Sequence, residues 1–509
     1  MVRIAMLAGS RPIALEMPEN GTALPPPAPP EEVIVDVSAA VRDALSFPLT
    51  GLPLAELARG KRSATILVEP PALPVPSGTR DPRLEALVAT SDELEAAGIP
   101  SRSQTILVAA GLGRKPGRRE LAALVTPEFR RRFRGLVVAH DVEDPDMANL
   151  GDAGGTPILL NRMLREAELV VTLSAAESVM HGGPSLLLSA GAAEPLQAAQ
   201  DSPSLLETGG SHGWRLALAF ERALEREVPL IGVSLSLAPP RLGGLAGGYP
   251  YDALAIGRIA RSKLRRALAL APRSLRWRML AAAPVEIAAT AAFAGPPSVA
   301  HAEALLAMLA TRTTEIDEEF DVLCIPVPDT TLMLPRERPN PLAVAAFGLG
   351  YAYRRWRDGS PLSKGGSIVL VHGFERHFAH PGQQPYRLFF MAAARFGRER
   401  DTLAQAARDA RTDPRALALY RQGQSCHPLL PFADWDACRP AIERAGSVVV
   451  AGCRDSSAAR QLGFIPTHGV GHALELAAGS VGENARVGFM LGPPYAALRP
   501  ATVPPPSLG

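Results

Sequence analysis

The sequence is poor in cysteine and aromatic residues, and it has no excess of charge of either sign. Four cysteines are spread over 509 residues without a Cys-x-x-Cys pair, and aromatic residues make up 5% of the chain. This cysteine usage argues against a zinc ribbon and fits the reducing cytoplasm. The formal net charge is +2, so electrostatics give no support for nucleic acid or an acidic lipid surface as a partner.

Long hydrophobic runs are also missing. No stretch approaches the roughly 18 uninterrupted apolar residues that a membrane span needs. The nearest candidate is the Ala-rich segment 279–294, which Pro284 and Glu286 interrupt. The apolar run before residue 10 is too short for a signal peptide, and Arg11 and Pro12 follow it. We therefore expect a cytoplasmic protein with no membrane partner.

The amino-acid composition is typical of a globular protein, and the order of the apolar runs predicts alternating strands and helices. Hydrophobic residues make up 47% of the chain and charged residues 20%. Short apolar runs predict buried strands, and helical patterns separate them, which is typical of βαβ units and a mostly parallel sheet. These predicted strands are 64–68, 105–110, 136–139, 169–173 and 230–237, and in a second series 321–325, 367–371, 447–451 and 486–491.

The two series predict two Rossmann-like α/β domains with mostly parallel sheets and a cleft between them. We expect the domains at 31–252 and 319–492, joined by a helical segment at 253–318 that is rich in Ala, Leu and Arg. Residues 1–30 are predicted to form an N-terminal strand and a Pro-rich arm, and 493–509 a Pro-rich tail.

The stretch 151–191 is central to the functional prediction. We expect a helix at 157–166 and a buried strand at 169–173, followed by a loop with Glu177, His181 and a Gly-Gly pair. In open α/β sheets, ligands bind in loops beyond the carboxyl ends of strands. This loop is therefore the first place where chemistry is expected.

Several blocks of the sequence resemble the nickel-dependent lactate racemase family. They are LEAAGIPSRSQTILVAAGLGRKPGRREL, VVAHDVEDPD and GTPILLNRMLREAELVV, with GGSIVLV and ARVGFMLGPP in the second half. The resemblance implies a two-domain protein that racemises or epimerises 2-hydroxy acids with a nickel-pincer nucleotide. In that family a lysine carries the nucleotide, and histidines act as acid, base and nickel ligand.

The positions that carry this chemistry in the family are changed in this chain. Gly113 and Val179 stand where the family has histidines, and Ser185 stands at the lysine position. Pro70 and Leu73 replace an aspartate and an arginine. The resemblance therefore implies the family's fold together with a remodelled site, and the nucleotide is implied by resemblance alone.

Polar residues in strand-end loops are the candidates for a remaining site. The catalytic candidates are His181, which lies two residues beyond the lost histidine position, and His140 at a strand end. For His140 and Asn161 the alternative is a structural polar pair. The candidate cofactor-binding residues are Arg114, Glu177, Gly182, Gly183 and Ser185.

A histidine-rich loop follows the predicted strand 367–371. Its His372, His377 and His380, with Glu375, fall within nine residues and are candidate ligands for zinc or nickel. The alternative is an ordinary polar loop, because the spacing is irregular and no helix fixes its geometry.

Three functional hypotheses remain open at this point. The first is a lactate-racemase-like isomerase with a remodelled site. The second is a non-catalytic paralogue that binds a small anion, such as a hydroxy acid, or a protein partner in the interdomain cleft. The third is a metal-dependent enzyme that uses the loop 372–380.

Overall fold

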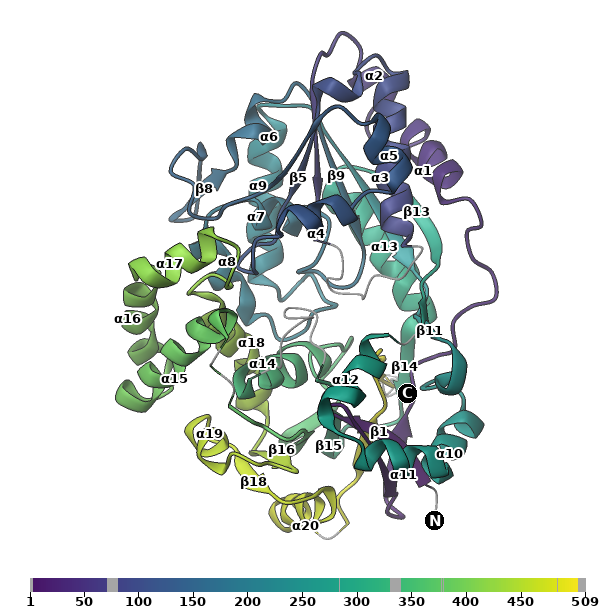
Figure 1. Ribbon diagram of the computed structural model, residues 1–509, viewed down its shortest axis with the longest axis vertical. Coiled ribbons are helices and arrows are strands. Elements are labelled where there is room, and N and C mark those ends of the chain that lie inside the picture. Colours follow the sequence, from purple (N-terminus) through teal and green to yellow (C-terminus); the bar gives the residue numbers. More distant parts are fainter. Residues whose placement is uncertain are drawn as a thin grey trace, which may run out of the picture.

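Two six-stranded sheets form the centre of the fold, as the ribbon diagram shows (Figure 1). The computed structural model describes residues 3–70, 81–282, 284–329, 340–376, 378, 380–482 and 484–501. The predicted α/β class with large parallel sheets is confirmed. We call the sheet nearer the top of Figure 1, with its helices, the first unit, and the other sheet with its helices the second unit.

The first sheet is parallel except at one edge. Its strand order is β13-β10-β9-β4-β5-β6, and only the pairing of β13 with β10 is antiparallel. The chain moves outward from β4 in one direction and returns to form β9 on the other side, so a topological switch point lies between these strands. The strands are β4 (Ala64–Val68), β5 (Gln104–Val108), β6 (Leu136–Ala139), β9 (Val170–Ala175), β10 (Leu230–Leu237) and β13 (Ala289–Gly295).

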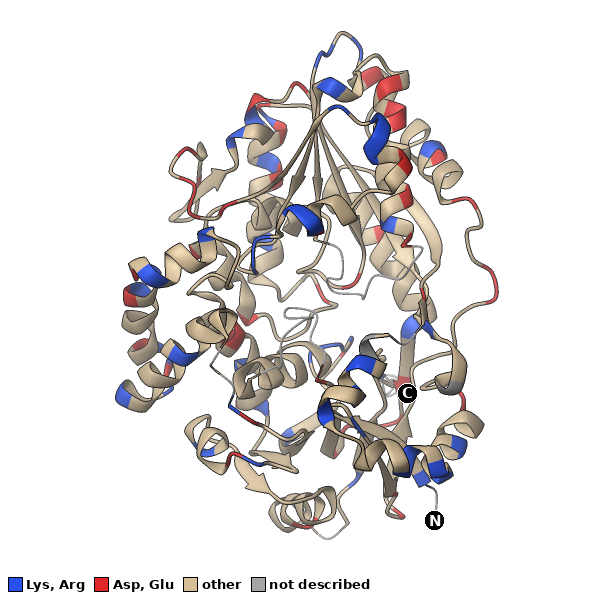
Figure 2. Cartoon of the chain, viewed as in Figure 1, with Lys and Arg blue, Asp and Glu red and all other residues tan. Residues whose placement is uncertain are grey.

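Both faces of this sheet are buried, which explains why its strands are continuous apolar runs. Ile66 belongs to a core with Val41 of α1 and Leu87 of α3, whereas the next residue, Leu67, belongs to a core with Leu187 of α7. Figure 2 shows the charged residues on outer helices and loops, while the strands of the first sheet carry none. The covering helices are α1 (Val37–Ser46), α3 (Pro82–Ala96), α7 (Pro184–Ser189), α9 (His212–Glu225) and α13 (Pro297–Arg312).

The second sheet is wholly parallel, with the order β18-β17-β16-β15-β19-β3. Its strands are β3 (Gly21–Leu24), β15 (Phe320–Pro326), β16 (Leu362–Val371), β17 (Ser447–Ala451), β18 (Ile465–Thr467) and β19 (Val487–Met490). Its helices are α14 (Pro341–Ala345), α15 (Gln384–Phe396), α16 (Arg400–Arg411), α17 (Pro414–Arg421), α18 (Leu430–Arg444), α19 (Ser456–Gln461) and α20 (Val470–Val481). A π-helical turn, η4 (Ala346–Ala352), continues α14.

The N-terminal residues join the second unit. β1 (Arg3–Ala8) and β2 (Arg11–Glu16) form an antiparallel hairpin, and β3 pairs with β19 at the edge of the second sheet. The predicted N-terminal strand is therefore one of three strands, and a sheet partner far along the chain holds the third in place.

Two segments that were expected to be helical contain strands. In 253–318, α10 (Ala253–Arg261), α11 (Lys263–Leu270) and α12 (Arg273–Ala281) are helical, but β13 follows them. Its alanines favour a helix locally, and pairing with β10 overrides that preference. In 157–166, β8 (Thr156–Leu160) pairs with β7 (Ala148–Ala153), and a short helix, α6 (Arg162–Glu166), follows.

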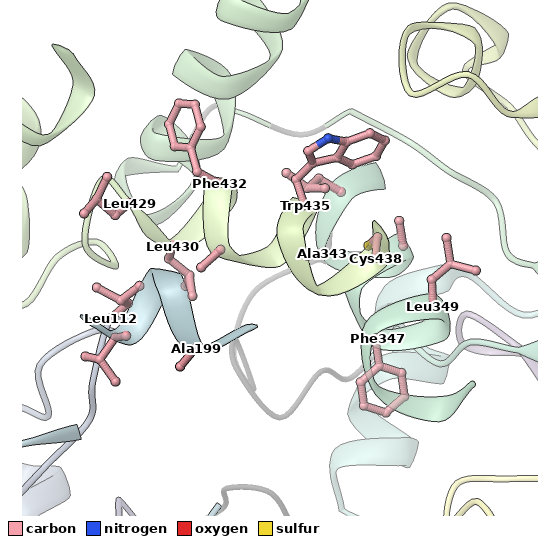
Figure 3. Close-up of a cluster of buried hydrophobic side chains, with 14 of the residues drawn as sticks. Leu112, Ala199, Ala343, Phe347, Leu349, Leu429, Leu430, Phe432, Trp435 and Cys438 are labelled. Carbon is pink, nitrogen blue, oxygen red and sulfur yellow. The ribbon is translucent and has the colours of Figure 1, made fainter. Parts of the chain in front are cut away.

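An apolar cluster joins the two units (Figure 3). It contains Leu112 and Ala199 from the first unit together with Leu430, Phe432 and Trp435 of α18. Burial of apolar side chains on both sides stabilises this interface without any ligand. Among the described residues, no helix has the length and apolar character that crossing a membrane requires.

Candidate site between the two units

The Gly-Gly pair in the loop after β9 is shaped by a histidine from α13. Gly182 and Gly183 have φ values of +94° and +53°, and a Cβ on Gly183 would lie 2.4 Å from Cβ of His301. The backbone N–H of Gly183 donates to Ser174 Oγ at 2.9 Å. The two glycines therefore allow the close approach of His301, which fills the space beside them.

His301 is a fully buried histidine that fixes the loop. Its Nε2 lies 2.9 Å from the carbonyl oxygen of Ser178, and its Nδ1 lies 3.2 Å from Ser234 Oγ. Burial lowers the pKa of His301 to about 4, so the ring is neutral at pH 7 and donates from Nε2. Sequence reasoning missed this residue, although a single histidine inside an apolar helix was a usable signal.

Ser185 and Val179 stand at the family's lysine position and at one of its histidine positions, and both side chains are buried. Ser185 is buried, and its hydroxyl donates to the carbonyl oxygen of Val179 at 2.8 Å. Val179 is itself fully buried in an apolar cluster. Gly113 is equally constrained, because a Cβ there would lie 2.9 Å from the carbonyl oxygen of Ala110.

Glu177 is the carboxylate at the centre of a buried ion-pair network. It pairs with Arg312 at the end of α13, and its Oε2 lies 3.3 Å from Nη1 of Arg355 in the second unit. Arg312 also donates to the carbonyl oxygens of Leu237 and Ala238 at 2.6 and 3.1 Å. Burial acts to raise the pKa of Glu177, but Arg312 and Arg355 outweigh it and hold this pKa below its usual range.

His181 lies beside this network. The Ser178 hydroxyl is 2.8 Å from its Nδ1, which leaves Nε2 with the proton in the neutral ring. Burial lowers the pKa of His181 to about 4, and Arg355 and Arg354 act in the same direction against Glu177. The side chain is half-buried and neutral at pH 7.

The described part of this network has a positive charge, because two arginines share one glutamate, and a third buried arginine, Arg354, acts on the neighbouring His181. Arg312, Arg354 and Arg355 are 5%, 1% and 2% exposed, and Glu177 is 1% exposed. Tyr351 completes the group, because its hydroxyl accepts a hydrogen bond from Arg355 at 3.1 Å. Burial raises the pKa of Tyr351, so it stays neutral. The arginines were not predicted as site residues.

His140 is remote from this network and is fully engaged. Asn161 donates its amide to Nδ1 at 3.0 Å, so Nε2 carries the proton and donates to the carbonyl oxygen of Gly191 at 2.9 Å. Burial lowers the pKa of His140. This geometry matches a structural polar pair with Asn161 and leaves neither ring nitrogen free for acid–base work.

Arg114 lies at another contact between the units. It pairs with Glu120 and donates to the carbonyl oxygen of Gly423 at 3.2 Å. The neighbouring Lys115 pairs with Asp141 at 2.8 Å. Arg114 thus holds two loops together and does not reach the Glu177 network through any described contact.

Two histidines of the loop 372–380 also make hydrogen bonds within the protein. His372 Nδ1 accepts from the backbone N–H of Phe374 at 3.0 Å, and its Nε2 donates to Asp329 at 3.2 Å. His380 Nδ1 accepts from the N–H of Gly382 at 3.1 Å, and His377 lies outside the described residues. Within the described ranges, no three His, Cys, Asp or Glu side chains are close enough together to hold a metal ion.

A solved structure of similar fold is found among known proteins. The lactate racemase apoprotein from Thermoanaerobacterium thermosaccharolyticum is 15% identical with a TM-score of 0.58, over 96% of this chain and 97% of that one. A protein from Thermotoga maritima is 11% identical with a TM-score of 0.46, over 91% and 97%. No curated protein matches the sequence.

Part of the sequence also matches the model of a known protein family. Residues 9–182 match the lactate racemase N-terminal domain. The match covers β4 to β9 and ends inside the loop with the Gly-Gly pair. The resemblance expected from the sequence blocks is thereby confirmed: residues 9–182 are similar to the lactate racemase N-terminal domain, and the chain as a whole shares its fold with a lactate racemase apoprotein.

Proposed function

We propose that this lactate-racemase-like protein binds a small anion, such as a 2-hydroxy carboxylate, between its two units and does not act as a nickel-pincer racemase. The observation that carries the proposal is the charge of the buried network. In the described contacts, two guanidinium groups, those of Arg312 and Arg355, share the carboxylate of Glu177, and a third buried guanidinium group, that of Arg354, acts on the neighbouring His181. We also propose domains at 31–252 and 319–492 and a cytoplasmic location.

An excess of buried positive charge is costly unless an anion compensates it. Removing a charge from water costs several kcal/mol in a protein, and a partner must offset this cost. The nearby histidines do not supply a negative charge, and Tyr351 is neutral. A ligand carboxylate would supply the missing charge and would bridge residues of both units.

The residues present do not fit the pincer nucleotide. A serine hydroxyl cannot replace the lysine amine that carries the nucleotide in the family. The Ser185 hydroxyl also already donates a hydrogen bond to the carbonyl oxygen of Val179. The backbone at Gly113 has no room for a histidine side chain. No step of a reaction is therefore assigned to that cofactor.

His181 has a defined role in the proposed site. Its neutral ring presents Nε2–H next to Arg354 and Arg355, with Nδ1 held by Ser178. A ligand hydroxyl or carboxylate oxygen would accept from this N–H. The low pKa of about 4 makes His181 a hydrogen-bond donor and not a cation at neutral pH.

The test combines metal analysis with ligand binding. The full chain, purified from cells that make the pincer nucleotide, is expected to contain neither stoichiometric nickel nor a nucleotide mass. L- and D-lactate should raise the Tm of this protein, while sodium chloride at the same ionic strength should not. Stoichiometric nickel, or no response to any 2-hydroxy acid, would contradict the proposal.

A second candidate function, residual isomerase activity, is favoured by Glu69. This residue follows β4 at the switch point, and its Oε1 is buried without a hydrogen-bond partner in the described part of the chain. Burial raises the pKa of Glu69 to about 8, so it holds a proton near neutral pH. Chiral chromatography of L-lactate incubated with the protein and with Glu69→Gln tests this candidate, and racemisation that E69Q abolishes would support it.

A further inference from the structure

Arg354 is a buried arginine with one half of its guanidinium group unused. Its side chain is 1% exposed, and Nη1 donates to the carbonyl oxygens of Gly350 and Ala437 at 3.3 Å each. Nε and Nη2 are shielded from solvent and have no hydrogen-bond partner among the residues that the structure describes. These two atoms form the edge of a guanidinium group that docks a carboxylate or phosphate with two parallel bonds.

Three other arginines of this protein show what that edge normally binds. Arg83, Arg273 and Arg376 each place Nε and Nη2 on one carboxylate, those of Asp81, Asp329 and Asp455. In Arg273 the distances from Nε and Nη2 to Asp329 are 3.2 and 2.7 Å. Arg354 is more deeply buried than Arg273 and lacks this carboxylate.

The surroundings of Arg354 do not supply a matching anion. Cys438 and Asp201 are the acidic groups that act on it. Burial raises the pKa of the Cys438 thiol well above its usual value, so it stays neutral, and Asp201 lies 3.9 Å from another arginine, Arg400. Burial lowers the pKa of Arg354 to about 10, so the group remains a cation at neutral pH. The two residues that follow also hold buried donors without partners, Arg355 Nε and Trp356 Nε1.

The location joins the two units. Arg354 follows η4 of the second unit, and its carbonyl oxygen accepts from the backbone N–H of Leu205 in the first unit at 2.8 Å. Ser204 Oγ donates to the carbonyl oxygen of Trp356 at 2.5 Å. The backbone of Arg354 therefore lies where the two units meet, and its guanidinium group lies against η4 and α18 of the second unit.

We infer that the Nε–Nη2 edge of Arg354 is the seat of the ligand's oxyanion, a carboxylate or a phosphate group bound through two parallel hydrogen bonds. This inference rests on the proposed function and adds the residue and the ligand class. A buried water could satisfy the same two donors, but it would leave the positive charge uncompensated.

The experiment uses the full chain and the variants Arg354→Met, Arg354→Lys and Arg376→Lys, with lactate and inorganic phosphate as probes. Titration calorimetry should show binding weakened about a hundredfold in R354M and about tenfold in R354K, because lysine keeps the charge and loses the two-point geometry. R376K should bind like the wild type, because that side chain contacts Asp455 and is far more exposed. If the wild type binds lactate but does not bind phosphate, the site at Arg354 takes a carboxylate. If it binds phosphate but does not bind lactate, the site takes a phosphate group.

A thermal measurement without ligand separates a ligand seat from a purely structural arginine. R354M should have a Tm at or above that of the wild type, because it removes an uncompensated buried charge. If R354M has a lower Tm than the wild type but binds the probes as tightly, Arg354 is a structural residue. This result would overturn the inferred anion site at Arg354 but not the proposed function. A wild type that binds neither probe would overturn both the seat and the proposed function. If R354M does not fold, R354K decides, and wild-type binding by R354K overturns the inference.

Discussion

Arg355 of the second unit donates both to the carboxylate and to the backbone carbonyl oxygen of Glu177 in the first unit. Its Nη1 lies 3.3 Å from Oε2 and 3.2 Å from the carbonyl oxygen. The same nitrogen also donates to Tyr351. One side chain therefore links the loop that follows β9 to the turn that follows α14.

Replacing Glu177 by glutamine should destabilise the protein strongly. The substitution leaves Arg312 and Arg355 buried without a countercharge, which costs about 3–5 kcal/mol in free energy of unfolding. Urea denaturation at pH 7 measures this loss. The matched control is Glu315→Gln, which breaks an exposed pair with Arg499 and should change stability by about 0.5 kcal/mol or less. Equal losses in the two variants would contradict a buried network.

Gly183→Ala should cost much more stability than Gly154→Ala. Both glycines have similar positive φ values, +53° and +63°. The added methyl group would collide with His301 at position 183 and would meet open space at position 154. We expect a loss of about 3 kcal/mol or more for G183A and about 1–2 kcal/mol for G154A, measured by urea denaturation. A similar loss in both would show that His301 does not constrain the loop.

Stability should fall on acidification through His301. Its folded pKa of about 4 lies below the unfolded value of about 6.5, so the unfolded chain takes up a proton first as the pH falls. Its contribution is complete above the unfolded pKa and is lost progressively between pH 6.5 and 4. This group should remove roughly 2 kcal/mol between pH 7 and pH 5.

Urea titrations at pH 7 and pH 5 should therefore show a smaller difference for His301→Gln than for the wild type. The control is His212→Gln, because His212 is exposed at the start of α9 and should leave the pH dependence unchanged. Identical pH dependence in H301Q and the wild type would mean that His301 is not held neutral.

Glu69→Gln should stabilise the protein at high pH. Burial raises the folded pKa of Glu69 to about 8, so the unfolded chain ionises first as the pH rises. Its favourable contribution is therefore lost between pH 4.5 and 8. E69Q should be about 4 kcal/mol more stable than the wild type at pH 8 and no more than about 1 kcal/mol more stable at pH 5. Glu56→Gln, at an exposed position in the short helix α2 (Leu54–Leu57), should show no such pH dependence.

The sequence predicted several strands of both sheets well. The runs 64–68, 136–139, 230–237 and 447–451 coincide with β4, β6, β10 and β17 residue for residue. Each is a mainly apolar run without a charged residue, so the local pattern defines it. The Ala-rich β13 could not be found in this way, because its strand conformation depends on pairing with β10.

The candidate site could be predicted only on the side of the first unit. Glu177 and His181 follow a recognisable strand, and ligand sites lie at such strand ends. Arg354 and Arg355 come from the turn after a helix about 180 positions further along the chain, and no local pattern connects them to that loop. Their signal in the sequence was two consecutive arginines directly after an apolar helix.

The pairing of β3 with β19 has a consequence for biosynthesis. Gly21 lies opposite Val487, so this edge of the second sheet cannot form until nearly the whole described chain has been made. Until then, β3 has no sheet partner, whereas the strands of the first sheet other than β13 are complete by residue 237. We expect the first unit to fold early during synthesis and the second to close late, with the N-terminal strand exposed to other chains in the interval.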